Sequence, residues 1–161
     1  MINALTKFTQ PRPDAALLLI RGITGIVFSF HGAQKLFGAF GGPGLEGFAG
    51  YLASLGFPFP TVNAYLAGGT EFFGGLALLL GLGTRFVSLP LAFTMLVASF
   101  TVHAGSFSNQ VGGMEYSLTL AVVSVALALS GGGRHSLERL IPKASTPKAS
   151  AKSSSPSLAA L

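Results

Sequence analysis

The sequence predicts an all-α integral membrane protein whose helices form a four-helix bundle. Half of the 161 residues are hydrophobic, only 9% are charged, and four apolar segments are candidates for spanning helices. A soluble domain of this length carries about a quarter charged residues, because its surface faces water. The mean hydropathy of +0.63 indicates that this chain lacks such a surface.

The candidate spanning segments are residues 15–37, 62–82, 86–104 and 116–130. A bilayer core is about 30 Å thick and takes roughly 20 helical residues to cross. The fourth segment is short, and including Met114 and Glu115 brings it closer to that length. Short turns after the second and third segments predict an up-and-down bundle of antiparallel neighbours. Small residues at helical spacing, among them Gly25, Ser29 and Gly75, predict close contacts between helices.

Between the first two segments lies a Gly-rich stretch, residues 38–60, which is too short and too polar to span. Apolar residues recur within it at helical spacing, with Pro43 before them and Gly56 after them: Leu45, Phe48, Leu52 and Leu55. Proline and glycine favour these positions at helix boundaries. We predict a short interfacial or re-entrant helix that caps one mouth of the bundle, with an ordinary surface loop as the alternative.

The positive charges predict the orientation. They lie before the first segment, between the second and third, and after the fourth: Lys7, Arg12, Arg85, Arg134, Arg139 and Lys143. The other side of the bundle offers only Lys35, so the positive-inside rule places both termini in the cytoplasm. We therefore predict a cytoplasmic N-terminal segment (1–14), a membrane domain (15–140) and a disordered cytoplasmic tail (141–161) rich in Ser, Ala, Lys and Pro.

Composition excludes several classes of function. The chain has no cysteine, which rules out disulfides, thiol catalysis, cysteine-ligated zinc and iron–sulfur clusters within it. Redox chemistry would therefore need a bound cofactor or a partner protein. The net charge of +5 comes largely from the chain ends, and no basic stripe with interleaved aromatic residues appears, so nucleic acid is not an expected partner.

Polar residues inside the apolar segments are the candidates for chemistry. On the first segment Arg21, Thr24, Phe28, His31 and Lys35 follow one another at spacings of 3, 4, 3 and 4, which puts them on one face. Glu71 lies near the middle of the second segment. A charge at that depth costs about 2.5 to 3.5 kcal/mol, so it needs a partner or a wet cavity.

Counting along the helices makes Arg21 the expected partner of Glu71, with His31 at a similar distance on the other side. We take Glu71, His31 and Arg21 as candidate catalytic residues. The alternative for Glu71 and Arg21 is a buried ion pair with a purely structural role.

A second polar cluster is predicted at the outer mouth of the bundle. The third segment carries Ser88, Met95, Ser99 and His103 on one stripe, which brings His103 to the depth of residues on the first and fourth segments. The candidate cofactor-binding residues there are Gln34, Lys35, His103 and Glu115. Together with His31 they could hold a polar head-group such as a quinone carbonyl. The alternative is a set of helix-end charges that reach out to water.

The sequence gives little support to a haem site and none to a metal site. His31 and His103 could in principle ligate a haem between two helices, but two histidines with no further signature are a poor signal, so haem is not expected. No metal site is predicted either.

Several short motifs occur together in this chain. Arg21-Gly22 opens the first segment and is followed by FHGAQKLFG (30–38), LGFP (55–58), EFFGG (71–75), LGLGTR (80–85) and GGGRHSLE (131–138). As an ensemble over roughly residues 15–140, they resemble the DoxX family of small bacterial membrane proteins. Members commonly close with Asp where this chain has Glu138.

The resemblance implies a four-helix inner-membrane protein described as an oxidoreductase subunit. Relatives are associated with thiosulfate:quinone oxidoreductase and with oxidative-stress complexes that include superoxide dismutase and a sulfurtransferase. The family offers no agreed catalytic set to carry over. The positions that match its recurrent pattern are Arg21, His31, Lys35, Glu71 and Arg85.

Three functions remain open from the sequence. The first is a membrane subunit of a redox or oxidative-stress complex that binds a quinone, with Glu71 and His31 handling protons and Arg21 tuning the acid. The second is a non-catalytic anchor for soluble enzymes, and the third, less favoured, is a small transporter. The expected partners are the lipid bilayer, soluble or membrane redox proteins, and a second copy of the chain.

Overall fold

The computed structural model describes residues 12–141, and within that range the chain is all-α with no strand. Its five α-helices are α2 (Pro13–Phe37), α3 (Gly44–Ser54), α4 (Pro60–Leu80), α5 (Thr84–Val97) and α6 (Glu115–Ser130). The all-α prediction is confirmed, and so is a helix between the first two long ones, with Pro43 at its N-terminal cap and Gly56 just after it. The N-terminal segment and tail fall outside the described residues, apart from 12–14 and 141.

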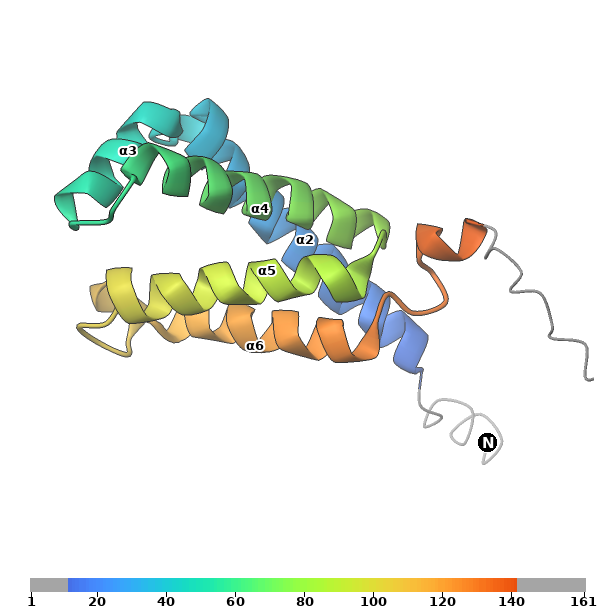
Figure 1. The fold of residues 1–161 in the computed structure, drawn as a ribbon. Helices are drawn as coiled ribbons and strands as arrows, with labels where there is room; N and C mark the ends of the chain where they lie inside the picture. The colour runs from blue at the N-terminus through green and yellow to red at the C-terminus, as the bar shows by residue number, and fades with distance from the viewer. Residues whose placement is uncertain (1–11, 142–161) are drawn as a thin grey trace, which may run out of the picture.

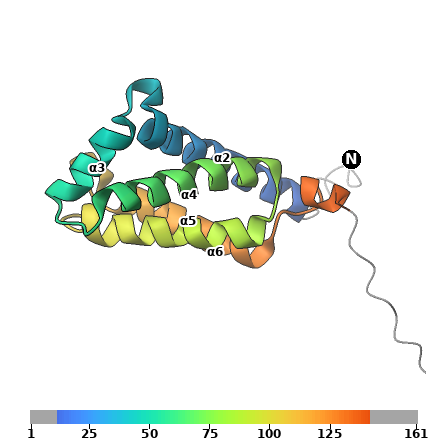
Figure 2. The same ribbon diagram turned by 45° about the horizontal axis from the view of Figure 1, so that its top comes forward.

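The long helices pair as two antiparallel hairpins, α2 with α4 and α5 with α6, while α3 lies across one end (Figures 1 and 2). At the opposite end the backbone N–H of Arg134 donates to Asp14 Oδ1 at 2.8 Å, so the start of α2 meets the loop after α6. Arg12, Arg85 and Arg134 therefore share this end of the bundle. Which side of the membrane this end faces stays a prediction.

Glycines let α2 and α4 approach to backbone contact. A Cβ added at Gly75 would lie 2.5 Å from the backbone nitrogen of Ser29, and one added at Gly25 would lie 2.7 Å from the carbonyl oxygen of Gly75. Gly32 meets the backbone of Phe72 in the same way. Small residues are what permits such close helix packing in membranes. These contacts fix the register of α2 against α4.

The third long helix, α5, is irregular at two places. Pro90 lies inside α5, and the helix continues through a π-helical turn at Ala98–Val102. Proline removes one backbone donor, and the Thr94 hydroxyl donates to the Pro90 carbonyl at 2.9 Å. The segment predicted as a uniform helix over 86–104 thus starts two residues earlier and ends in a wider turn. Such π turns often occur at functional sites.

The surface is apolar and part of the interior is polar. Large hydrophobic side chains are exposed on all four long helices, as at Leu19, Phe73, Phe93 and Leu129. The buried polar side chains include Arg21, Glu71, Ser88, Ser99 and Ser124. Water would disfavour this distribution, whereas lipid accepts an apolar exterior provided that polar groups are enclosed.

Within residues 12–141, two helices are both long and apolar enough to cross a membrane, Pro13–Phe37 and the continuous segment Thr84–Val102. Only 28% of each is buried inside the protein, which differs from the core helix of a soluble domain. With 21 residues α4 is long enough but less apolar, since it carries glycines and Glu71. Helix α6 is apolar but has only 16 residues. The four-span bundle therefore stays a prediction for α4 and α6.

Two glycines of α4 offer a matched test of the close packing. Alanine at Gly75 would collide with the α2 backbone, whereas a Cβ at Gly69 meets nothing within 4 Å. We expect Gly75→Ala to destabilise the protein by about 1–3 kcal/mol through overpacking, and Gly69→Ala to be neutral or to stabilise it by up to about 1 kcal/mol through helix propensity. Unfolding in detergent micelles titrated with SDS, followed by circular dichroism, measures both. Equal stability of the two variants would contradict the packing.

Candidate functional site

The polar centre of the protein is an ion pair between Lys35 and Glu71. Lys35, in the last turn of α2, places Nζ 2.5 Å from Glu71 Oε1 on α4. The Glu71 side chain is 1% exposed and that of Lys35 is 25% exposed. The Lys35 ammonium also lies 5.1 Å from the ring centroid of Phe48, which comes from α3. Three helices thus enclose the pair.

The second carboxylate oxygen of Glu71 is open to a further partner. Oε2 is buried, and the described part of the chain gives it no hydrogen bond. A buried polar atom in a native structure normally has a partner in protein, water or ligand. This oxygen therefore marks a position where a water or a ligand donor would bind.

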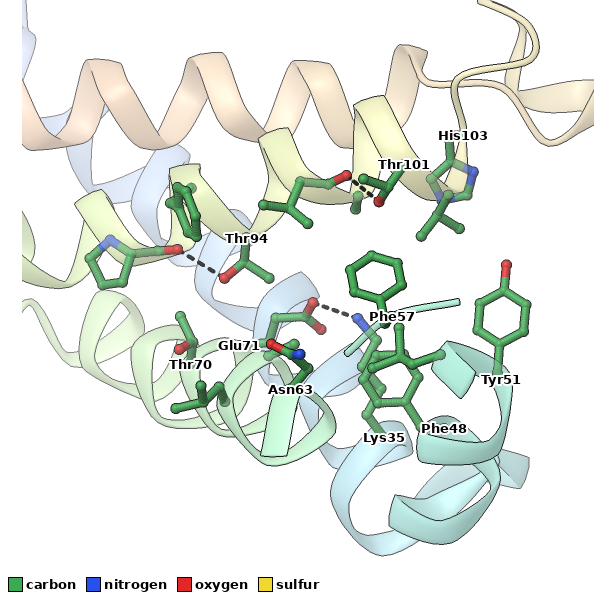
Figure 3. Close-up of a pocket in the computed structure, with 18 residues that line it drawn as sticks. Lys35, Phe48, Tyr51, Phe57, Asn63, Thr70, Glu71, Thr94, Thr101 and His103 are labelled. Atoms are coloured by element: carbon green, nitrogen blue, oxygen red, sulfur yellow. Dashed lines mark hydrogen bonds and ion pairs between the residues drawn. The ribbon is translucent and has the colours of Figure 1, made fainter. Parts of the chain in front are cut away.

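A pocket of about 610 Å³ opens beside the pair (Figure 3). Its walls come from α3, α4, α5 and the π turn, and most of them are apolar. Lining residues on the α3 and α4 side include Phe48, Tyr51, Phe57, Asn63, Leu66, Ala67 and Thr70, and those from α5 onward include Pro90, Phe93, Thr94, Val97, Thr101 and His103. We call this the larger pocket. Its volume and apolar walls suit a small organic ligand.

Most other polar side chains of the larger pocket already bond to backbone. The Thr94 and Thr101 hydroxyls donate to carbonyls one turn earlier, and Asn63 Nδ2 donates to the Pro58 carbonyl at 2.6 Å. His103 Nδ1 lies 2.7 Å from the Gly112 carbonyl. In Figure 3 the ammonium of Lys35 and the carboxylate of Glu71 face each other in the middle of the residues drawn. This pair is therefore the charged group that a ligand in the pocket would meet.

A second pocket, of about 220 Å³, lies on the other side of the same ion pair, between α2, α5 and the start of α6. Its lining comprises Phe28, His31, Lys35, Glu71, Met95, Ala98, His103, Tyr116, Ser117 and Leu120. We call this the smaller pocket. Since Lys35, Glu71, Ala98 and His103 line both pockets, the ion pair stands at the boundary between them.

The structure brings together part of the predicted outer cluster. His31, Lys35 and His103 all line the smaller pocket, and Gln34 Oε1 lies 3.1 Å from His31 Nδ1. Glu115 lies elsewhere: its half-buried side chain accepts the backbone N–H of Asn109 at 2.7 Å and thereby holds the loop before α6. As the first residue of α6, Glu115 also suits the positive end of the helix dipole. The structure thus places it outside both pockets.

The expected pairing of Arg21 with Glu71 is wrong. The buried Arg21 guanidinium donates to the carbonyls of Leu78 at 2.9 Å, Leu79 at 3.2 Å and His135 at 2.6 Å. The register explains why: Gly32 lies against Phe72, so Glu71 is level with Gly32. Arg21 is eleven residues away along α2, or about 16 Å at 1.5 Å per residue, whereas Lys35 is three residues away.

Arg21 instead ties the loop after α6 to the end of α4. Its guanidinium covers Gly81, where an added Cβ would lie 2.7 Å from the Arg21 Cζ. The Glu138 backbone N–H donates to the Gly81 carbonyl at 3.2 Å, and Ser136, which belongs to this loop, is buried. Arg21 is therefore a structural residue at the end of the bundle far from both pockets.

Sequence reasoning overlooked Phe48, Phe57 and Thr94 as pocket residues. Phe48 belongs to the apolar face of α3, which the sequence assigned to a cap over the bundle. Thr94 lies one turn after Pro90, and a hydroxyl four residues after a helical proline is a usable signal for a local distortion. Phe57 lies in the α3–α4 connection, and the sequence carries no comparable signal for it.

These features define a small helical membrane protein with an apolar shell and a lysine–carboxylate pair that lies between the larger and the smaller pocket. The chain belongs to the DoxX family, whose model matches residues 16–104 and so covers Lys35, Glu71 and His103. It is similar to "Putative oxidoreductase CatD" of Bacillus subtilis (strain 168), with 34% identity over 73% of this chain and 81% of that protein. It is also similar to "Inner membrane protein YqjF" of Escherichia coli (strain K12), with 30% identity over 81% and 95% of the two chains. No solved structure matches it significantly.

Because Arg21 holds the loop after α6, its replacement should affect that loop and not the two pockets. Arg21→Met should release the loop after α6, because three carbonyls lose a charged donor. Hydrogen–deuterium exchange at residues 135–141 should become faster, while the amides of α3 keep their protection. Arg139→Met, an exposed arginine in the same loop, is the control and should leave exchange unchanged. Unaltered exchange in Arg21→Met would contradict the assignment.

A double-mutant cycle tests the central ion pair. Lys35→Met should destabilise the protein by about 2 kcal/mol, less than for a fully buried pair because Lys35 is partly exposed. Lys35→Met combined with Glu71→Gln should recover much of that loss, since no charge is then left buried alone. Unfolding in mixed micelles measures the coupling. Strictly additive effects would show that the two side chains do not interact.

Proposed function

We propose that this chain is the membrane subunit of a redox system at the bacterial inner membrane, and that it binds a quinone head-group in the larger pocket. In this proposal all four long helices cross the bilayer and both termini lie in the cytoplasm. One observation carries it: a lysine–carboxylate pair borders an apolar pocket of about 610 Å³, and the buried carboxylate has one oxygen without a hydrogen bond from the described part of the chain.

The lining residues suit the chemistry of a quinone. A quinone is a flat ring with two carbonyl acceptors and an apolar tail. The Lys35 ammonium has three donors, of which one is used on Glu71, so it can also donate to a carbonyl. The rings of Phe48 and Phe57 provide apolar surface beside it. This combination of one polar contact and apolar walls is typical of cofactor pockets.

In this proposal Glu71 is the residue that takes up and releases protons. Reduction of a quinone to a quinol takes two electrons and two protons, with the electrons supplied by a soluble or membrane redox protein. Glu71 can hold a proton on Oε2 and release it toward the pocket, while Lys35 stabilises the carboxylate that results. Compared with the sequence-based hypothesis, Lys35 replaces Arg21 beside the acid, and Glu115 leaves the set of binding residues.

The comparisons support the general class of this proposal. One relative is named as an oxidoreductase and another as an inner membrane protein. The two alignments cover 81% and 95% of the relatives' lengths. The quinone, the redox partner and the orientation are our own proposals.

Quinone content is the direct test. The protein is purified in mild detergent, and extracted quinone is quantified by chromatography. We expect a stoichiometric amount in the natural protein and about tenfold less or lower in Lys35→Met, since the loss of one charged hydrogen bond costs at least that much. We expect a similar loss of quinone in Ala67→Phe. Ala67 lines the larger pocket, so a phenylalanine there fills it. Ala126→Phe, on the exposed face of α6, is the matched control and should keep its quinone.

A quinone-free natural protein that also fails to bind added short-chain quinone would contradict the proposal. Two further measurements then separate the alternatives. Loss of soluble redox enzymes from membranes when the gene is deleted would favour an anchor. Solute uptake by vesicles containing this protein alone would favour a transporter.

A further inference from the structure

The smaller pocket has the size and lining of a water chamber. Its volume of about 220 Å³ is room for several water molecules. Phe28, Met95 and Leu120 form its apolar walls, while its polar lining comes from His31, His103, Tyr116 and Ser117. Water occupies a cavity when it finds two to four polar partners there. This lining provides them, so the pocket is suited to hold a short chain of waters.

Glu71 faces this chamber from the boundary with the larger pocket. Its Oε1 is held by Lys35, which leaves the buried Oε2 as the atom that can gain or lose a proton. The titratable or charged groups that share the chamber with it are Lys35 and His31 from α2, His103 after the π turn, and Tyr116 from α6. Glu71 is therefore a buried acid with a polar route on one side and an apolar ligand pocket on the other.

His31 and Tyr116 link the chamber to the surface. Their rings make an edge-to-face contact with centroids 6.2 Å apart, and Tyr116 is 43% exposed. His31 Nδ1 is engaged by Gln34, which holds the imidazole in place. With Nδ1 bonded to Gln34 Oε1, Nε2 is the nitrogen through which the imidazole can accept a proton and release it again. The route reaches the surface where α2 ends and α6 begins.

We infer that the smaller pocket is a hydrated proton chamber through which Glu71 exchanges protons with the surface by way of His31 and Tyr116. The inference rests on the proposed function only for the identity of the ligand that Glu71 serves. Ligand and protons then reach Glu71 from opposite sides of the ion pair. The chamber opens at the end of the bundle far from Arg21, so with cytoplasmic termini the protons are exchanged with the outer side of the membrane.

Infrared spectroscopy on ligand-free protein in phosphatidylcholine vesicles tests this route. After a downward pH step, the carbonyl stretch of protonated Glu71 is followed in time and identified by its absence in Glu71→Gln. Leu120→Phe narrows the chamber, and Leu129→Phe makes the same change at an exposed position of the same helix. Tyr116→Phe removes the hydroxyl and keeps the ring. Ala67→Phe fills the larger pocket instead.

We expect Leu120→Phe and Tyr116→Phe to slow Glu71 protonation by about tenfold or more, as for loss of a proton-transfer group, and Leu129→Phe to leave the rate unchanged. A stronger effect of Ala67→Phe than of Leu120→Phe would overturn the inference, as would equal rates in all variants or a natural protein without a pH-dependent Glu71 band. If Leu120→Phe does not fold, Tyr116→Phe decides. The infrared experiment uses protein without quinone, so its outcome does not depend on whether the quinone proposal is correct.

Discussion

The contact between Lys35 and Glu71 is the constraint on which the rest of the structure depends. A carboxylate in the middle of an apolar helix is unfavourable in lipid unless a partner or water reaches it. The partner is a lysine in the last turn of α2, and it reaches Glu71 only because glycines bring the two helices into backbone contact. The glycines of α2 and α4 thus allow α4 to carry the charge of Glu71, because they let Lys35 reach it.

The same pair divides the interior into two compartments. Helices α5 and α6 form their own hairpin, so the space between the hairpins is filled only in part. Helix α3 covers one mouth through Phe48, whose ring lies beside the Lys35 ammonium. On one side the pocket is large and apolar, and on the other it is small and lined by His31 and Tyr116. This asymmetry suits a site where an apolar ligand meets a proton source.

Sequence reasoning located the helices, the short helix at α3 and the need of Glu71 for a basic neighbour, because each follows from local pattern or from the cost of burying charge. It chose Arg21 as that neighbour because depth was counted from helix ends. The choice of partner depends on the register between α2 and α4, and the glycine contacts that set this register are visible only in the folded chain. Likewise the bond from Asn109 to Glu115 depends on a loop conformation with no periodic signal. The family resemblance is confirmed by the match over residues 16–104.

The most direct test of this account measures the Lys35–Glu71 contact in a lipid bilayer. Solid-state NMR on protein carrying ¹⁵N in lysine side chains and ¹³C in glutamate carboxyls, compared with Lys35→Arg to assign the signal, reports the dipolar coupling between the two groups. The account predicts a strong coupling from direct contact, as given by the 2.5 Å separation of Nζ and Oε1. A Glu71 carboxyl without coupling to any lysine nitrogen would contradict it.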